Sequence, residues 1–240
     1  MRHVEHVMGT VFSFDVPGGA PMGPVVAWLH HVDAVFSPYR PDSPVSRLAR
    51  GELEPAGCPA EVTEVLALCA QAEHDSDGYF TVFPFGRFDP SGLVKGWAID
   101  RAAALLRESG ARCHSVNGGG DVRLGAAPGR PWRVGVAHPL RPGRLATVVT
   151  GSDLAVATSG TAERGPHICD PRTGSPATGL ASITLVGPRL TTVDAYATAA
   201  FAMGPVTARE WVEAMDGLEA FAVLPSGSTW QTSGFAAFTA

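Results

Sequence analysis

Residues 153–180 hold a group of side chains that can bind an anion and move a proton. The segment reads DLAVATSGTAERGPHICDPRTGSPATGL, and it passes from an alternating apolar strand into a run of hydroxyls, glycines and one imidazole. The groups that can do chemistry are Ser159, Gly160, Thr161, His167 and Arg172. Hydroxyls and backbone N–H groups donate, an arginine forms a forked pair with an anion, and a histidine titrates near neutral pH. This mixture predicts a site for a ligand with an anionic group.

Two further pairs of residues lie near the starts of predicted helices. Asp194 and Thr198 are four residues apart, so their side chains share one helix face. Taken alone, the pair is equally compatible with an aspartate favoured by the helix dipole and a packed threonine. Lys95 precedes Gly96 at the opening of another helix, where a lysine and a helix N-terminus together can bind an anion. A solvated surface lysine is the alternative interpretation.

Two glycine-containing segments can bring the backbone close to a ligand. The triplet Met8-Gly9-Thr10 interrupts a predicted strand or strand pair, where a glycine marks either a bulge or a close approach. Residues 117–121, NGGGD, form a turn between two predicted strands. No helix follows this turn and no G-K-[ST] follows it, which excludes a dinucleotide fingerprint and a P-loop. A tight β-hairpin is compatible with the same residues.

Apolar periodicity predicts the elements that must position these groups. Helices are expected over residues 24–36, 60–72, within 89–110, from 191 and over 205–215. A short helix after residue 43 is expected to be capped by Ser43 or Ser46, and the helix from 191 by Thr191 or Thr192. Strands are expected over residues 4–16, 112–116, 132–137, 146–150, 153–158, 181–186, 219–224, 228–232 and 235–238. The three strands between residues 132 and 158 are predicted to form a meander.

Composition and charge limit the class of protein. The chain has 240 residues, 45% hydrophobic and 17% charged, which predicts a globular protein, here one domain over residues 1–240. A net charge of −5 gives no basic footprint for nucleic acid. No apolar run approaches the ~20 residues of a membrane span, and residues 1–19 lack a signal-peptide pattern. We therefore expect no membrane insertion and a cytoplasmic location. The four scattered cysteines predict reduced core thiols rather than a zinc site.

Six segments, in this order, resemble the motifs of the ApbE family, the FAD:protein FMN transferases. They are MGT at 8–10, FSPYRPDSPVSRL at 36–48, SDGYF at 76–80, KGWAID at 95–100, NGGGD at 117–121, and ATSG at 157–160 followed by HICDPRTG at 167–174. Two positions depart from the family pattern. Ala49 stands where an asparagine is usual, and Thr81 stands where an aspartate is usual. The change at Ala49 removes or replaces one polar contact to the nucleotide.

The resemblance implies an α+β fold of the T-fold-like ApbE architecture, in which strand meanders pack with helices. It implies Mg²⁺-dependent transfer of FMN from FAD to a threonine hydroxyl of an acceptor protein, with release of AMP. Mg²⁺ would be bound by Asp194, Thr198 and a backbone carbonyl at Val94 or Ala98. His167 would act as the base and, together with Asp194, would be catalytic.

The positions expected to contact FAD come from all of these motifs. They are Met8, Gly9, Thr10, Ser37, Tyr39, Asp77, Gly78, Lys95, Gly119, Asp121, Ser159, Gly160, Thr161, His167 and Arg172. Two other functions stay open: hydrolysis of FAD to FMN and AMP at the same site, and a flavin-binding module without chemistry. The change at Ala49 keeps both open, whereas the presence of His167, Asp194 and Thr198 argues against the inert module.

Overall fold

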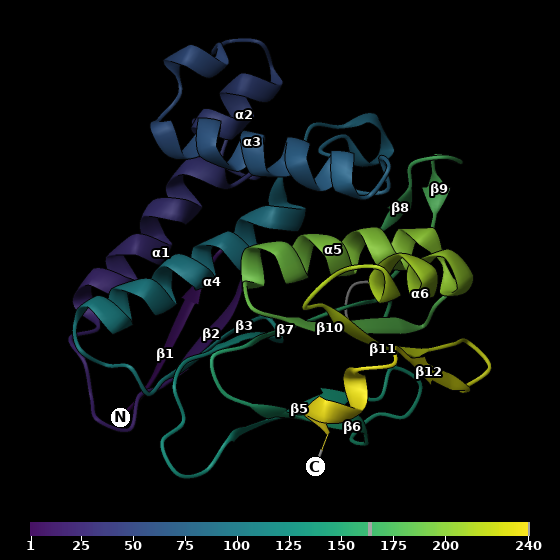
Figure 1. Ribbon diagram of the computed structural model, residues 1–240. Coiled ribbons are helices and arrows are strands. Elements are labelled where there is room, and N and C mark those ends of the chain that lie inside the picture. The colour runs from purple at the N-terminus through teal and green to yellow at the C-terminus, as the bar shows by residue number, and fades with distance from the viewer. Residues whose placement is uncertain (163–164, 240) are drawn as a thin grey trace.

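The protein is described by a computed structural model that covers residues 1–162 and 165–239 (Figure 1). Eight strands form the main sheet: β1 (Arg2–Val7), β2 (Thr10–Asp15), β3 (Ser115–Gly118), β4 (Asp121–Leu124), β7 (Ala155–Gly160), β10 (Ser182–Gly187), β11 (Glu219–Val223) and β12 (Thr229–Gln231). Two hairpins stand apart from it: β5 (Trp132–Ala137) with β6 (Leu145–Gly151), and β8 (Cys169–Asp170) with β9 (Ser175–Pro176). The helices are α1 (Gly23–Phe36), α2 (Pro44–Ala49), α3 (Ala60–Asp75), α4 (Ser91–Glu108), α5 (Leu190–Met203) and α6 (Pro205–Glu213). Three 3₁₀ turns complete the described elements: η1 (Pro55–Gly57), η2 (Pro84–Gly86) and η3 (Phe235–Phe238).

The main sheet separates a helical layer from a small second sheet. Its strand order is β1-β2-β3-β4-β7-β10-β11-β12, and every neighbouring pair is antiparallel. The six helices lie on one side of the sheet, and β5 and β6 lie on the other (Figure 1). This arrangement confirms the expected α+β class. Within the described ranges, no helix combines the length and the apolar character that crossing a bilayer requires.

Two tight turns join the first four strands into two hairpins, β1 with β2 and β3 with β4. Met8 and Gly9 link β1 to β2 with φ values of 54° and 67°, and Gly119 and Gly120 link β3 to β4 with 59° and 96°. Left-handed backbone at both turn positions matches the twist of a two-residue hairpin and favours glycine. The strand-pair interpretation of residues 4–16 is therefore confirmed, and Gly9 lies in the turn rather than at a bulge.

The alternation of side chains along the sheet divides the hydrophobic core in two. In β7, Ala155 and Ala157 belong to the cluster shared with the helices, whereas Val156 belongs to the cluster on the side of β5 and β6. The second cluster also contains Val149 of β6 and Phe235 of η3. Both faces of the central strands are therefore covered, which explains why every residue of β10 is buried.

Three expectations about the elements are wrong. The strands between 132 and 158 do not form a meander, because β5 and β6 make their own sheet while β7 pairs with β4 and β10. Residues 235–238 form a 3₁₀ turn instead of a strand. Neither Thr191 nor Thr192 caps α5 with its own side chain. Instead, the Asp100 carboxylate of α4 accepts hydrogen bonds from the Thr191 N–H and hydroxyl at 2.8 and 2.7 Å.

Candidate active site

The crossing of α4 and α5 places a carboxylate against a backbone amide. Gly96 lies so close to α5 that a Cβ atom there would stand 2.5 Å from the Leu190 carbonyl oxygen and 2.8 Å from Asp194 Cβ. No side chain fits at those distances, so the approach requires glycine. The Gly96 N–H donates a hydrogen bond to Asp194 Oδ2 at 2.9 Å. Gly96 therefore fixes where the Asp194 carboxylate lies.

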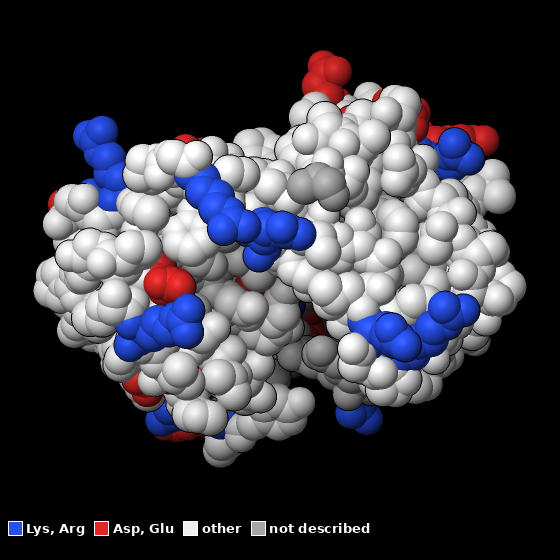
Figure 2. Space-filling view, turned by 90° about the horizontal axis from the view of Figure 1, so that it is seen from below, with Lys and Arg blue, Asp and Glu red and all other residues white. Residues whose placement is uncertain are grey.

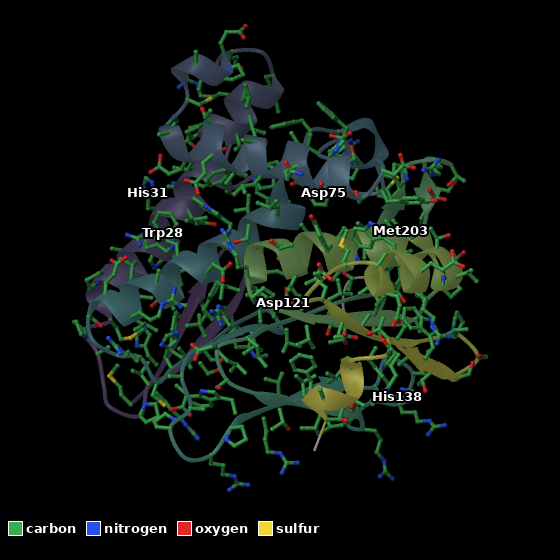
Figure 3. All side chains as sticks on the ribbon, viewed as in Figure 1. Trp28, His31, Asp75, Asp121, His138 and Met203 are labelled. Atoms are coloured by element: carbon green, nitrogen blue, oxygen red, sulfur yellow. The ribbon has the colours of Figure 1, made fainter. Side chains whose placement is uncertain are left out.

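Lys95 and Asp121 complete a buried charged cluster with Asp194. Lys95 Nζ pairs with Asp121 Oδ2 and lies 3.4 Å from Asp194 Oδ1. The Asp121 and Asp194 side chains are only 2% and 7% exposed. The other Asp121 oxygen, Oδ1, accepts a hydrogen bond from the Thr158 N–H at 2.9 Å. Figure 3 shows Asp121 between the sheet and the helices. When both carboxyls are ionised, one ammonium leaves one negative charge uncompensated.

Burial makes the charged form of Asp194 unfavourable. Removal from water is the largest cause, and together with the Asp121 charge it raises the pKa of Asp194 to about 7, against the opposing effect of Lys95. A carboxyl that titrates near neutrality exchanges its proton for a metal cation at physiological pH. The cluster therefore has the electrostatic character of a cation site.

The donor atoms around Asp194 are oxygens, the ligands that Mg²⁺ prefers. Thr198, one turn further along α5, directs Oγ1 at the Asp194 carbonyl at 3.3 Å and retains lone pairs for a further partner. The Ala98 carbonyl is directed at α1, where it accepts a hydrogen bond from Trp28 Nε1 at 3.0 Å. This position does not support Ala98 as a metal ligand and leaves Val94 as the other candidate. In the part of the chain that the structure describes, no group of three or more His, Cys, Asp or Glu side chains could hold a metal. The residues present therefore fit an oxygen-bound cation that also uses substrate oxygens.

The main sheet opens beside this cluster. β4 and β7 pair at only two positions, and beyond them the Asp121 side chain, rather than strand backbone, binds β7. The two glycine turns lie next to each other there: the Gly119 N–H donates to the Val11 carbonyl at 3.1 Å, and a Cβ at Gly119 would lie 2.9 Å from Thr10 Oγ1. From the side of β5 and β6, the surface is hollowed near its centre (Figure 2). The structure thus brings the predicted positions of the MGT and NGGGD motifs together.

His167 lies on the loop before β8 and not beside the carboxylates. It is exposed, and its Nδ1 lies 2.9 Å from the Gly165 carbonyl oxygen. Because a carbonyl can only accept, Nδ1 carries the proton and Nε2 keeps the lone pair that a base needs. β8 packs against α5 near the end from which α6 follows, whereas Asp194 lies in the first half of α5 (Figure 1). Among the described residues, no hydrogen bond joins His167 to Asp121 or Asp194.

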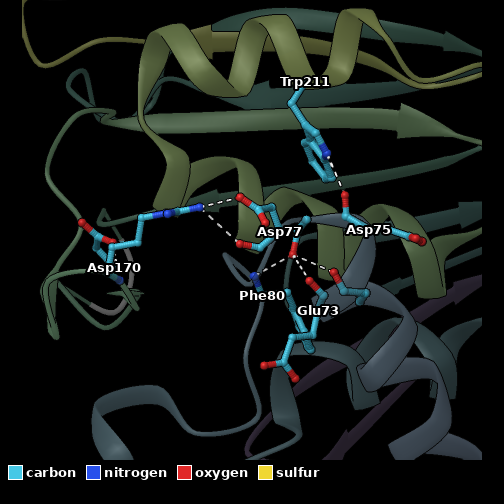
Figure 4. A network of polar contacts seen from close by, with 9 residues as sticks. Glu73, Asp75, Asp77, Phe80, Asp170 and Trp211 are labelled. Carbon is cyan, nitrogen blue, oxygen red and sulfur yellow. Dashed lines mark hydrogen bonds and ion pairs between the residues drawn. The ribbon is translucent and has the colours of Figure 1, made fainter.

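Arg172 joins the loop that carries His167 to Asp77, which lies in the turn that follows α3 and is labelled in Figure 4. Its guanidinium donates to the Asp77 carboxylate at 2.7 Å and to the Asp77 carbonyl at 3.3 Å, and it lies 4.5 Å from the centre of the Tyr79 ring. Asp77 and Gly78 have φ values of 51° and 79°, the left-handed region that permits so sharp a turn. The structure therefore brings Asp77, Gly78 and Arg172 together, and the arginine is engaged by protein groups.

The turn that carries Asp77 is anchored to the last two helices. Tyr196 OH donates to Asp75 Oδ2 at 2.5 Å, and Trp211 Nε1 donates to the Asp75 carbonyl at 3.0 Å. Burial, with the neighbouring Asp75 carboxylate, raises the pKa of Tyr196, so its hydroxyl remains a donor. Sequence reasoning missed Asp75, Tyr196 and Trp211, because these contacts span 121 and 136 residues and no local pattern marks them.

The remaining predicted flavin-binding residues lie at the ends of two elements. Ser159 and Gly160 end β7, with Ser159 buried on the face toward α5, and Thr161 follows them. Ser37 ends α1, and its carbonyl accepts hydrogen bonds from the hydroxyls of Ser43 and Ser46. Ser43 also caps α2, as predicted, by accepting a hydrogen bond from the Ser46 N–H at 3.1 Å. The next predicted position, Tyr39, is 93% exposed and is therefore open to a ligand.

Comparison with known sequences gives one family. The profile of the ApbE family matches residues 8–83 and 85–222. The FAD:protein FMN transferase of Rhodobacter capsulatus is 33% identical over 186 residues, which are 74% of this chain and 33% of that protein. The FAD:protein FMN transferase of Escherichia coli strain K12 is 29% identical over 165 residues, 62% of this chain and 47% of that protein. The chain thus spans a third to a half of the length of these relatives.

Comparison with solved structures gives one fold. The flavin transferase ApbE from Vibrio cholerae superimposes with a TM-score of 0.86 at 22% identity, over 99% of this chain and 98% of that one. The apo form of the Pseudomonas stutzeri flavinyl transferase ApbE gives a TM-score of 0.84 at 24% identity, over 100% of this chain and 97% of that one. The ApbE protein from Thermotoga maritima gives 0.85 at 23% identity, over 100% and 99%. The expected architecture is confirmed.

Proposed function

Because the chain belongs to the ApbE family, we propose that it transfers the FMN part of FAD to a threonine hydroxyl of an acceptor protein and releases AMP. The observation that carries the proposal is the buried cluster of Lys95, Asp121 and Asp194, which lies where the main sheet opens. A pyrophosphate is cleaved where its charge is neutralised in a water-poor site. The names of the relatives support FAD as the substrate, and the charged cluster supports this position for the proposed cleavage.

The proposed metal is Mg²⁺. The Asp194 carboxylate, the Thr198 hydroxyl and a backbone carbonyl near Lys95 would hold it. Val94 is the preferred source of that carbonyl, because the Ala98 carbonyl is bound by Trp28. Phosphate oxygens of FAD would complete the oxygen shell, and the bound ion would neutralise charge on the pyrophosphate.

The proposed reaction is a phosphoryl transfer. The threonine oxygen of the acceptor bonds to the phosphorus of the FMN phosphate, and the bond from that phosphorus to the bridging oxygen breaks. AMP leaves with the bridging oxygen, and the hydroxyl proton passes to a base. In reactions of this type, positioning and charge neutralisation supply most of the catalysis.

His167 is the proposed base and Lys95 the proposed phosphate contact. The Gly165 carbonyl holds the His167 tautomer in which Nε2 can accept the threonine proton. Lys95 is the only lysine in the sequence, and its side chain is 22% exposed, so it can contact a phosphate from within the cluster. The loop that carries His167 would have to present it at the acceptor hydroxyl.

Release of AMP from FAD tests the proposal. We expect the protein with FAD and Mg²⁺ to release AMP, and a chelator to stop the release. The exposed Asp216→Ala is the matched control for Asp194→Ala, because each removes one carboxylate and Asp216 lies outside the cluster. If Asp194→Ala and Asp216→Ala release AMP at the same rate, the cluster does not take part in the reaction. Release of FMN and AMP with every acceptor left unmodified would favour FAD hydrolysis instead.

A further inference from the structure

We propose that the β5–β6 hairpin is a docking surface for an acidic segment of the acceptor protein. This basic hairpin comprises Arg130, Arg133, Arg141 and Arg144, which lie just before β5, on β5 and in the turn that leads to β6. The proposal rests on the proposed transferase function, and it names the kind of partner that this function requires.

Charge is distributed unevenly along the chain. Residues 122–152 contain five arginines and no acidic residue, so this segment carries a charge of +5. The whole chain carries −5, which leaves −10 on the remaining residues. An acidic partner is therefore repelled by most of the molecule and attracted at this segment, which orients its approach.

Four of these five arginines are exposed. Among the described residues, the guanidinium groups of Arg130, Arg133, Arg141 and Arg144 form no hydrogen bond and no ion pair. The fifth, Arg123, is buried and pairs with Asp100 at 3.4 Å. Exposed cations without an intramolecular partner keep their attraction for an incoming anion.

The basic hairpin borders the hollow in the face opposite the helices. β5 and β6 lie on that side of the main sheet (Figure 1), and His138 of their turn lies at the same side (Figure 3). Seen from there, Lys and Arg side chains lie on both sides of the hollow (Figure 2). The first and last residues of β5 are about 17 Å apart, because a strand advances about 3.3 Å per residue. A bound segment can therefore contact arginines at both ends of β5.

A protein segment fits this arrangement better than a lipid bilayer does. The cations are spread along a strand beside a hollow, and a flat bilayer would touch the rim and leave the hollow unfilled. Leu140 and Leu145, which are 46% and 58% exposed, place apolar surface among the arginines. Arginine next to apolar side chains is typical of protein–protein interfaces. An acidic segment seated here would bring an attached threonine to the hollow.

Binding of two peptides, measured without FAD or Mg²⁺, tests the docking surface separately from the chemistry. The peptides share one threonine-bearing segment and carry either a run of glutamates or a run of lysines, each with a fluorescent label. We expect the acidic peptide to bind more tightly, and its binding to weaken as salt screens the charges. Arg141→Glu with Arg144→Glu should weaken its binding about tenfold. Arg209→Glu on α6, an exposed arginine outside the hairpin, is the control and should leave binding unchanged.

Three outcomes would overturn the proposal. In the first, the acidic and the basic peptide bind equally well. In the second, the hairpin variant binds the acidic peptide as tightly as the wild-type protein does. In the third, the protein does not bind the acidic peptide but binds phosphatidylglycerol vesicles through the arginines of the hairpin. The last outcome would assign the surface to a membrane. AMP release from FAD without acceptor should be the same in the hairpin variants and the wild-type protein. If the wild-type protein releases no AMP from FAD, the transferase function is contradicted, whether or not the peptides bind.

Discussion

Replacement of Gly96 by alanine tests whether the close crossing of α4 and α5 builds the site. The added Cβ would stand 2.5 Å from the Leu190 carbonyl oxygen and 2.8 Å from Asp194 Cβ. The first contact is with backbone, so α4 and α5 must move apart. Overpacking of this kind costs about 1–3 kcal/mol, and the better helix propensity of alanine offsets up to ~1 kcal/mol. We therefore expect a net loss of about 1–2 kcal/mol in the free energy of unfolding.

The same shift should harm FAD cleavage more than stability. It lengthens the hydrogen bond from the Gly96 N–H to Asp194 Oδ2, now 2.9 Å, and it moves the carboxylate away from Lys95. Misplacement of a reacting group by about 1 Å can cost about 10²-fold in rate. Urea denaturation and the rate of AMP release from FAD are the two assays.

Gly92→Ala is the matched control in the same helix. A Cβ at Gly92 would lie 3.4 Å from the Phe80 ring, an ordinary contact with a side chain, so stability and cleavage should be unchanged or slightly raised. If Gly96→Ala and Gly92→Ala behave alike in both assays, the claim that the crossing positions Asp194 is wrong.

Three further predictions concern the charged groups of the site. Because the folded pKa of Asp194 is raised from 3.8 to about 7, the metal-free protein should lose roughly 3 kcal/mol of stability as pH rises from 4 to 7, a slope that Asp194→Asn should abolish; parallel urea curves would contradict this. His167→Ala should slow the transfer by about 10²–10⁴-fold and leave the affinity for FAD, measured by fluorescence, nearly unchanged; weaker binding at full rate would make His167 a binding residue. Arg172→Gln and Asp77→Asn should each lower the transfer rate by up to about tenfold and speed hydrogen exchange of the backbone amides in residues 165–176. The double variant should be no worse than either single variant, because both changes break the same contact. Additive effects would show that the two side chains act separately.

The elements that the sequence predicted well are those whose apolar residues repeat with the period of the element itself. The helix expected over 24–36 is observed over Gly23–Phe36, and the strand expected over 132–137 has those bounds. The wrong predictions concern segments whose structure or strand pairing depends on residues that are distant in sequence. Residues 235–238 form a short apolar run, which periodicity alone cannot assign to a strand, yet Phe235 packs on Phe221 with ring centres 5.6 Å apart, and this contact is compatible with a turn. Likewise, no pattern within β7 states that its neighbours are β4 and β10.

The residues of the candidate site were predicted from the sequence one by one, but their arrangement was not. Lys95, Asp121 and Asp194 were each selected from their own motif, and they come from α4, β4 and α5. Asp121 was expected to contact FAD, whereas in the structure its carboxylate holds Lys95 and the Thr158 N–H. Only the fold shows that a side chain of one motif binds a residue of another motif, because each of these contacts joins segments that are distant in sequence.

The mass of a threonine-bearing acceptor after incubation with the protein, FAD and Mg²⁺ tests the central claim most directly. The account predicts an increase equal to one FMN phosphoester with the wild-type protein and with Asp216→Ala, and no increase with Asp194→Ala. Modification by Asp194→Ala at the wild-type rate would contradict the assignment of the site. Release of free FMN and AMP by the wild-type protein, with the acceptor mass unchanged across several acceptors, would contradict transfer itself.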